Sequence, residues 1–151
     1  FMSERGLLGA INEVGSKVGM QASDLVASTL GLLGVPYRRG GATLATGFDC
    51  SGFVQYMFEH TLGLVLPRSA AQQAAATEKI DAGELKPGDL VFFNTMRRAF
   101  SHVGIYVGNG KFIHSPKPGG QVRIEDMQTS YWARRFDGAR RVAAHPQADS
   151  P

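Results

Sequence analysis

The dipeptide Asn109-Gly110 constrains the fold of this chain more than any other feature. It joins two apolar runs of β type, "HVGIYVG" and "KFIHS". Asn-Gly between such runs is the strongest short-range signal for a two-residue hairpin with a type I′ turn. Residues 102–108 and 111–115 are therefore expected to pair antiparallel. An isolated hairpin is only marginally stable in water, so further strands or a packed helix must accompany it.

The segments around this hairpin indicate that helices come first and strands follow. Apolar residues at helical spacing predict a helix in "ASDLVASTLGLLGVPY", a second from about Cys50 to Leu62, and a short Ala/Gln-rich one after Ser69. The stretch "RRGGATLATG" is expected to be a loop. "DLVFFN", "VRIED" and residues 136–142 have the composition of strands. This order predicts an α+β domain in which N-terminal helices pack on a central antiparallel β-sheet.

The length of 151 residues fits one domain with a core of its own. Residues 1–21 are Gly-rich and weakly patterned, so we expect a leader segment there, a domain over 22–143 and a flexible tail over 144–151. No apolar run approaches the roughly 20 residues that span a bilayer. The formal net charge is +3, without a Lys/Arg stripe that carries interleaved aromatics. We therefore expect no binding to nucleic acid. We also expect a monomer.

The only cysteine, Cys50, stands where the second predicted helix begins. A single cysteine excludes an intramolecular disulfide. The thiolate is the nucleophilic form of cysteine, and a thiol of ordinary pKa is mostly protonated at pH 7. The unpaired N–H groups and partial positive charge of a helix N-terminus lower that pKa. Free cysteines are also often small buried hydrophobes, so position alone leaves both interpretations open.

Two histidines, His102 and His114, lie on the two arms of the predicted hairpin. A nucleophile, a base and a group that orients the base are the three parts of a thiol acyl-transfer enzyme. A regular ladder around Asn109-Gly110 places His114 opposite Ile105, and therefore on the other face of the sheet from His102. A β-bulge would be needed to bring the two imidazoles to one site.

A zinc site is the competing hypothesis for these side chains. Its ligands would be Cys50, Asp49, His102 and His114. The cysteine and the histidines lack the short local spacing that structural zinc sites commonly have. We therefore expect no metal and no organic cofactor.

Six motifs in this chain resemble those of NlpC/P60 cysteine peptidases. In the order found in that family they are "LGLLGVPYRRGG", "GFDCSGFVQYMF", "LPRSAAQQ", "LKPGDLVFF", "SHVGIYVGNGKFIHS" and "YWARRFDGARRV". Together they cover about residues 22–142. The resemblance implies a papain-like fold, in which a cysteine-bearing helix packs on an antiparallel sheet. It also implies that both histidines belong to one site, against the regular ladder.

The resemblance further implies roles for individual residues. Cys50 matches the nucleophile, His102 the base and His114 the residue that orients it. Tyr37 matches a tyrosine that assists at the oxyanion or the substrate. A cap of the Cys50 helix is an equally good explanation of the aspartate before it. The positions that match substrate-binding residues in relatives are Asp49, Ser51, Arg68, Ser69 and Ser101.

The activity that the resemblance implies is hydrolysis of peptidoglycan stem peptides, at the bond between D-γ-glutamyl and meso-diaminopimelate. Such peptides lie outside the cytoplasmic membrane. The protein is therefore expected to be periplasmic, outer-membrane-anchored or secreted, with no signal or anchor recognisable in the chain. The alternatives are a cell-wall amidase or a thiol acyltransferase on the same fold, and a non-catalytic module that binds the cell wall.

Overall fold

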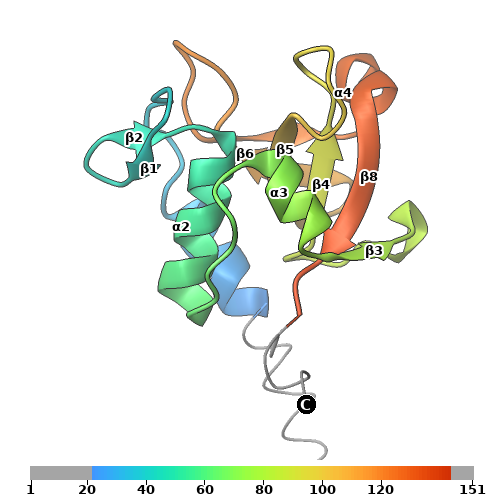
Figure 1. The fold of residues 1–151 in the computed structure, drawn as a ribbon, viewed down its shortest axis with the longest axis horizontal. Coiled ribbons are helices and arrows are strands. Elements are labelled where there is room, and N and C mark those ends of the chain that lie inside the picture. Colours follow the sequence, from blue (N-terminus) through green and yellow to red (C-terminus); the bar gives the residue numbers. More distant parts are fainter. Residues whose placement is uncertain (1–21, 144–151) are drawn as a thin grey trace, which may run out of the picture.

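A six-stranded antiparallel sheet forms the centre of the protein (Figure 1). The computed structural model describes residues 22–143, so the leader and tail expected at 1–21 and 144–151 lie outside the described residues. From one edge to the other the strands are β3 (Glu78–Ile80), β8 (Phe136–Arg141), β4 (Leu90–Phe93), β5 (His102–Gly108), β6 (Lys111–His114) and β7 (Arg123–Asp126).

The helices of the described part lie mostly before the sheet in the chain, as predicted. Residues 22–30 are helical, and α2 (Cys50–Leu62) and α3 (Ala70–Ala75) follow. The predicted bounds of α2 and the Ser69 cap of α3 are confirmed. A 3₁₀ turn covers Ala82–Glu84. Among residues 22–143, no helix has both the length and the apolar character to cross a bilayer.

Three short elements were not predicted. The segment expected to be a loop contains a small hairpin of β1 (Ala42–Thr43) and β2 (Gly47–Phe48). Strand β3 pairs with β8 at the edge of the main sheet, and the helix α4 (Ser130–Arg135) precedes β8. Strands of two or three residues and a helix of six are too short to show an apolar period, so pattern alone does not reveal them.

The two faces of the sheet carry separate apolar clusters. One face packs against α2 and the helix at 22–30. The largest side chains of the cluster between them include Phe53 and Phe58 from α2 and Phe92 from β4. The opposite face carries a smaller cluster built around Phe93 and Phe112, which Trp132 from α4 completes. The sheet is therefore covered on both faces, as the expected α+β architecture requires.

The predicted hairpin of β5 and β6 is present, with a register that differs from the regular ladder. Asn109 and Gly110 have φ values of 55° and 76°, which is the positive pair of a type I′ turn. The ladder shifts between Tyr106 and Gly108, so that Tyr106 pairs with Phe112. The expectation that Ile105 lies opposite His114 is thus wrong by one residue, and Ile105 pairs with Ile113 instead. The cause is a β-bulge at Val107, which leaves that residue without a partner in the ladder.

Candidate active site

The bulge in β5 brings the two hairpin histidines to the same face of the sheet. His102 pairs with Phe93 of β4, and the imidazole of His114 packs on Phe112. His102 Nε2 lies 2.7 Å from His114 Nδ1, with the two rings nearly perpendicular. His114 is fully buried and His102 is 3% exposed. The structure therefore places both imidazoles at one site, as the resemblance implied.

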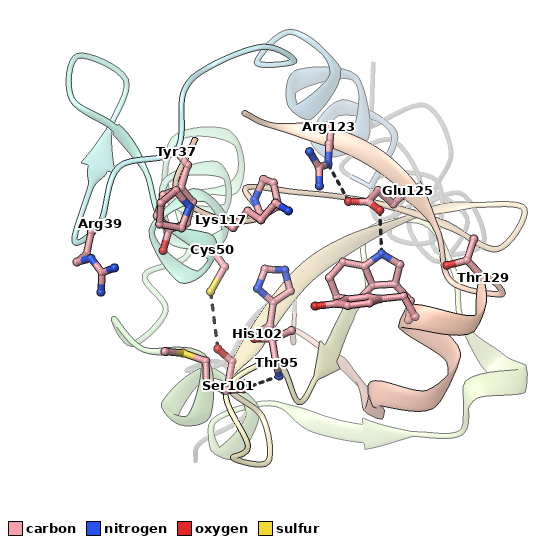
Figure 2. Close-up of a pocket in the computed structure, with 15 residues that line it drawn as sticks. Tyr37, Arg39, Cys50, Thr95, Ser101, His102, Lys117, Arg123, Glu125 and Thr129 are labelled. Carbon is pink, nitrogen blue, oxygen red and sulfur yellow. Dashed lines mark hydrogen bonds and ion pairs between the residues drawn. The ribbon is translucent and has the colours of Figure 1, made fainter. Parts of the chain in front are cut away.

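Cys50 is the first residue of α2, which packs against β5. The Asp49 side chain caps the helix by accepting a hydrogen bond from Gly52 N at 2.7 Å. A Cβ at Gly52 would collide with the carbonyl oxygen of Gly41, so the chain needs glycine there. Cys50 is half-buried, and its thiol points at the Ser101 carbonyl oxygen 4.0 Å away (Figure 2). The helix start thus presents the sulfur to the beginning of β5.

Arg68 fixes the residues on either side of Cys50. Its guanidinium binds both carboxylate oxygens of Asp49, at 3.1 and 2.9 Å, and also donates to Ser51 Oγ at 2.9 Å. It reaches the Gly41 carbonyl at 3.3 Å as well. A two-pronged contact of this kind fixes direction as well as distance. Arg68 therefore binds the side chains of both Asp49 and Ser51.

The chain of hydrogen bonds continues beyond His114 to a residue that the sequence did not single out. His114 Nε2 lies 3.0 Å from Glu125 Oε2, on the neighbouring strand β7. The same oxygen accepts from Arg123 Nε at 2.8 Å, and Oε1 accepts from Trp132 Nε1 at 2.9 Å. Phe112 pairs with Glu125 and His114 with Arg123, so these side chains share one face. In the sequence, the only feature that could have indicated a role for Glu125 is its place two residues after Arg123 in "VRIED".

Trp132 is both a core residue and part of the site. It is 6% exposed within the second apolar cluster. Its ring also stacks on His102, with centroids 5.5 Å apart and an angle of 26° between planes. One face of the imidazole is therefore covered by indole, which limits the orientations that His102 can adopt.

The hydrogen bonds define which nitrogen of each histidine carries a proton. An ionised Glu125 can only accept, so His114 Nε2 must donate to it. In a neutral His114 the other nitrogen, Nδ1, is then bare and accepts from His102 Nε2. It follows that a neutral His102 keeps its own Nδ1 free of a proton.

Burial controls the ionisation of the reactive groups. It raises the pKa of the Cys50 thiol to about 11, while the Val103 N–H lowers that pKa and the charge of Asp49 raises it further. Burial and then the neighbouring His114 hold the pKa of His102 well below its usual range. The backbone N–H groups of Cys50 and Ser51, at the start of the helix, lower the thiol pKa as expected, but desolvation outweighs them. Thiol and imidazole are both neutral at pH 7.

A cleft of about 590 Å³ lies over these residues (Figure 2). Of the nine predicted site residues, four line it: Tyr37, Cys50, Ser101 and His102. Burial first, and then the charges of Cys50 and Asp49, raise the pKa of the Tyr37 hydroxyl. Ser101 Oγ accepts from the backbone N–H groups of Thr95 and Met96, which shapes the loop beneath the sulfur.

The other predicted residues lie behind the lining. His114 supports His102 from the interior, and Asp49, Ser51 and Arg68 form the cluster described above. Ser69 is the N-cap of α3 and forms a capping box with Gln72. Substrate contacts by Asp49, Ser51, Arg68 and Ser69 stay predictions, since their observed contacts stabilise local structure.

The arrangement also bears on the zinc hypothesis. Within residues 22–143, no three side chains of His, Cys, Asp or Glu are grouped as ligands of a metal ion would be. His102 and His114 direct ring nitrogens at each other rather than at a common point. The two imidazoles and Glu125 form a continuous chain of hydrogen bonds.

Known proteins share much of this sequence. The chain is 47% identical over 113 residues to murein DD-endopeptidase MepH of Escherichia coli K12, covering 73% of this chain and 42% of that protein. It is 48% identical over 110 residues to the gamma-DL-glutamyl hydrolase of Bacillus subtilis 168, covering 72% of this chain and 26% of that protein. The chain thus spans less than half the length of either relative.

Solved structures show the same fold. A crystal structure of an NlpC/P60 family protein from Bacillus cereus superposes with a TM-score of 0.74 at 34% identity, covering 80% of this chain and 39% of that one. This confirms the expected fold, with the cysteine-bearing helix packed on an antiparallel sheet. The sequence profile of the NlpC/P60 family matches residues 34–141, from the end of the first helical segment to the last strand. By sequence and fold, this chain belongs to the NlpC/P60 family.

Proposed function

We propose that this protein is a cysteine peptidase that hydrolyses peptidoglycan stem peptides, with Cys50 as nucleophile and His102 as base. The observation that carries the proposal is the pairing of a helix-start cysteine with a buried imidazole at one cleft. The second nitrogen of that imidazole is bonded to His114 at 2.7 Å. His114 is the orienting residue in this scheme.

The reaction begins with a proton transfer. The Cys50 thiol gives its proton to His102 Nδ1 as the sulfur attacks the amide carbonyl of the substrate. Burial disfavours each charge separately, but the thiolate and the imidazolium form together and offset one another. Charge separation therefore accompanies attack, and a resting ion pair is not required.

The remaining steps use the same groups. The Cys50 N–H, at the start of α2, and the Tyr37 hydroxyl donate to the oxyanion that develops on the carbonyl oxygen. His102 returns its proton to the leaving amine when the C–N bond breaks, which leaves an acyl thioester on Cys50. Water then attacks the thioester, with His102 as general base, and the thiol is regenerated.

The charge of the cleft supports an acidic peptide as substrate. Its lining carries three cations, Arg39, Lys117 and Arg123, and one acidic side chain, Glu125. Glu125 is already occupied by Arg123 and His114. Arg39 and Lys117 have no carboxylate partner within residues 22–143. The free carboxylates of a stem peptide would complement this excess, and the bond from D-γ-glutamyl to meso-diaminopimelate is the one we propose.

The name of one relative, a murein DD-endopeptidase, also supports a substrate in the cell wall, and the name of the other describes hydrolysis of a γ-DL-glutamyl bond. Because peptidoglycan lies outside the cytoplasmic membrane, we propose an extracytoplasmic location. The two names differ in the bond, so the bond must be measured.

The test is digestion of purified muropeptides by the wild-type protein and by Cys50→Ala, with products identified by mass spectrometry. We expect the wild type alone to release a disaccharide that carries L-Ala-D-Glu, together with a peptide that begins with diaminopimelate. Cleavage confined to D-Ala–diaminopimelate cross-links would support the assignment as a peptidase and contradict the proposed bond. Unchanged muropeptides with the wild type would refute the proposal.

A further inference from the structure

We propose that Glu125 is a positioning residue, whose carboxylate fixes the protons of His114 and His102 so that a bare His102 Nδ1 faces Cys50. The inference rests on the proposed function, because it assigns a task within that mechanism. It extends the site by one residue, from the sheet strand that carries His114 to the edge strand β7.

The contacts of Glu125 allow only one ionisation state. Three N–H donors converge on its two oxygens, from His114, Arg123 and Trp132, at 3.0, 2.8 and 2.9 Å. A protonated carboxyl would have to donate toward one of these donors, so the site requires the carboxylate. In agreement, the hydrogen bond from His114 holds the pKa of Glu125 far below its usual range, although burial opposes the shift.

A fixed carboxylate then orders the whole chain. His114 must donate through Nε2, which leaves Nδ1 as the acceptor for His102 Nε2 at 2.7 Å. Without an acceptor at Nε2, His114 could carry its proton on Nδ1 instead. His102 would then have to move its own proton to Nδ1, the atom that the thiol needs. Residues that orient a functional histidine in this way commonly change activity by about 10- to 100-fold when removed.

The charge of Glu125 also acts on the imidazoles. The charged and titratable groups around the pair are Asp49, the cap of α2, Cys50 at the start of α2, and Glu125 and Arg123 from β7. Glu125 raises the pKa of both histidines, against the larger effect of burial, and Arg123 lowers that of His114. Removal of the carboxylate therefore disfavours the imidazolium that forms during attack. Removal of Arg123 favours it.

The experiment compares Glu125→Gln with Asp126→Asn as a matched control. Asp126 is the next residue of the same strand, pairs with Lys111 at 3.6 Å and does not line the cleft. Each variant loses one negative charge. The pH dependence of kcat/KM is measured on muropeptides. The alkylation rate of Cys50 by iodoacetamide is measured from about pH 4 to about pH 10, a range that includes the titration of both histidine and thiol.

We expect Glu125→Gln to lower the plateau of kcat/KM by about 10-fold or more. We also expect it to move the acid limb to lower pH by roughly one unit. The sign follows because the protonated pair, thiol with imidazolium, loses a stabilising negative charge. Asp126→Asn should move neither. A second variant, Arg123→Gln, should move the acid limb to higher pH, and it changes a side chain that is 42% exposed.

An unshifted acid limb in Glu125→Gln, or an equal shift in Asp126→Asn, would overturn the positioning role. The alkylation profile separates this inference from the proposed function, since iodoacetamide needs no peptidase substrate. A shifted alkylation profile with no muropeptide cleavage by the wild type would retain the role of Glu125 and reject the substrate. Circular dichroism and the Tm of each variant exclude unfolding as the cause of a lost plateau.

Discussion

The two walls of the cleft are built on different principles. The wall that carries Cys50 is a helix start, half-exposed and held by the contacts of Asp49 with Arg68. The wall that carries His102 is a sheet face buried among aromatic rings. In it, His102 Nε2 and both ring nitrogens of His114 have hydrogen-bond partners. The nucleophile is thus placed by polar surface contacts, and the base by packing. Mutations in the two walls should differ in how they divide between activity and stability.

The largest effect on activity with the smallest on stability is expected for Cys50→Ala. It removes the nucleophile, so muropeptide hydrolysis should fall by about 10⁴-fold or more. The half-buried Cys50 packs at the edge of the apolar cluster and makes a long contact to the Ser101 carbonyl. The substitution removes only the sulfur atom, so Tm should stay within a few degrees of the wild type. Activity assays and thermal denaturation check both parts. A fall in Tm as large as that of a core mutant would contradict the division between the walls.

On the sheet wall, Gly104→Ala should reduce stability and activity together. A Cβ at residue 104 would lie 2.7 Å from Phe112 Cδ2 and 3.1 Å from His114 Cβ. Overpacking of this kind destabilises by about 1–3 kcal/mol, and it pushes His114 away from His102. We expect a lower midpoint in urea and a lower kcat. Gly83→Ala, where a Cβ meets nothing within 4 Å, is the control.

On the helix wall, Asp49→Ala should lower stability by about 0.5–2 kcal/mol through the lost cap. Arg68 loses its two-pronged partner in the same variant, while Asp49→Asn keeps a capping oxygen and loses the charge. Chemical denaturation should therefore rank wild type, Asn and Ala in that order. Equal stability of the Asn and Ala variants would show that the Arg68 contact, and not the cap, holds the start of α2.

One hydrogen bond joins the two walls directly. The buried Ser115 Oγ, just after β6, donates to the Phe48 carbonyl at 2.7 Å, two residues before Cys50. Ser115→Ala leaves that carbonyl without this donor, which should lower the free energy of unfolding by about 1 kcal/mol. Because the walls then lose a fixed spacing, kcat should fall more than KM rises. Steady-state kinetics would contradict this if only KM changed.

The smallest effect is expected at the rim of the cleft. Lys117→Gln removes one exposed charge, and exposed ion pairs contribute about 0.2–1 kcal/mol. We expect KM for stem peptides with free carboxylates to rise by about 2- to 5-fold, less at high salt. Amidated stem peptides should show no such change. Lys79→Gln on the distant strand β3 serves as the charge control.

The parts of the structure that local chemistry determines were predictable, and those that depend on packing between distant segments were not. The start of α2 follows from Asp49 and the apolar spacing after it, and the hairpin from Asn109-Gly110. The bulge does not follow, because Val107 resembles any other strand residue. The role of Glu125 depends on the register of β7 against β6, across a connection whose length leaves that register open. The resemblance to a family supplied what the ladder could not, namely that both histidines meet.

The bulge at Val107 has a consequence for how the chain tolerates change in length. Side chains alternate between the faces of a strand, so the number of residues between His102 and His114 sets a parity for the active site. If the bulge is kept, adding or removing one residue elsewhere in that interval would place the two imidazoles on opposite faces of the sheet, whereas a deletion that removes the bulge would leave them on one face. Adding two would lengthen the hairpin and leave them together. The number of residues between the two histidines and the presence of the bulge therefore decide together whether both imidazoles reach one site.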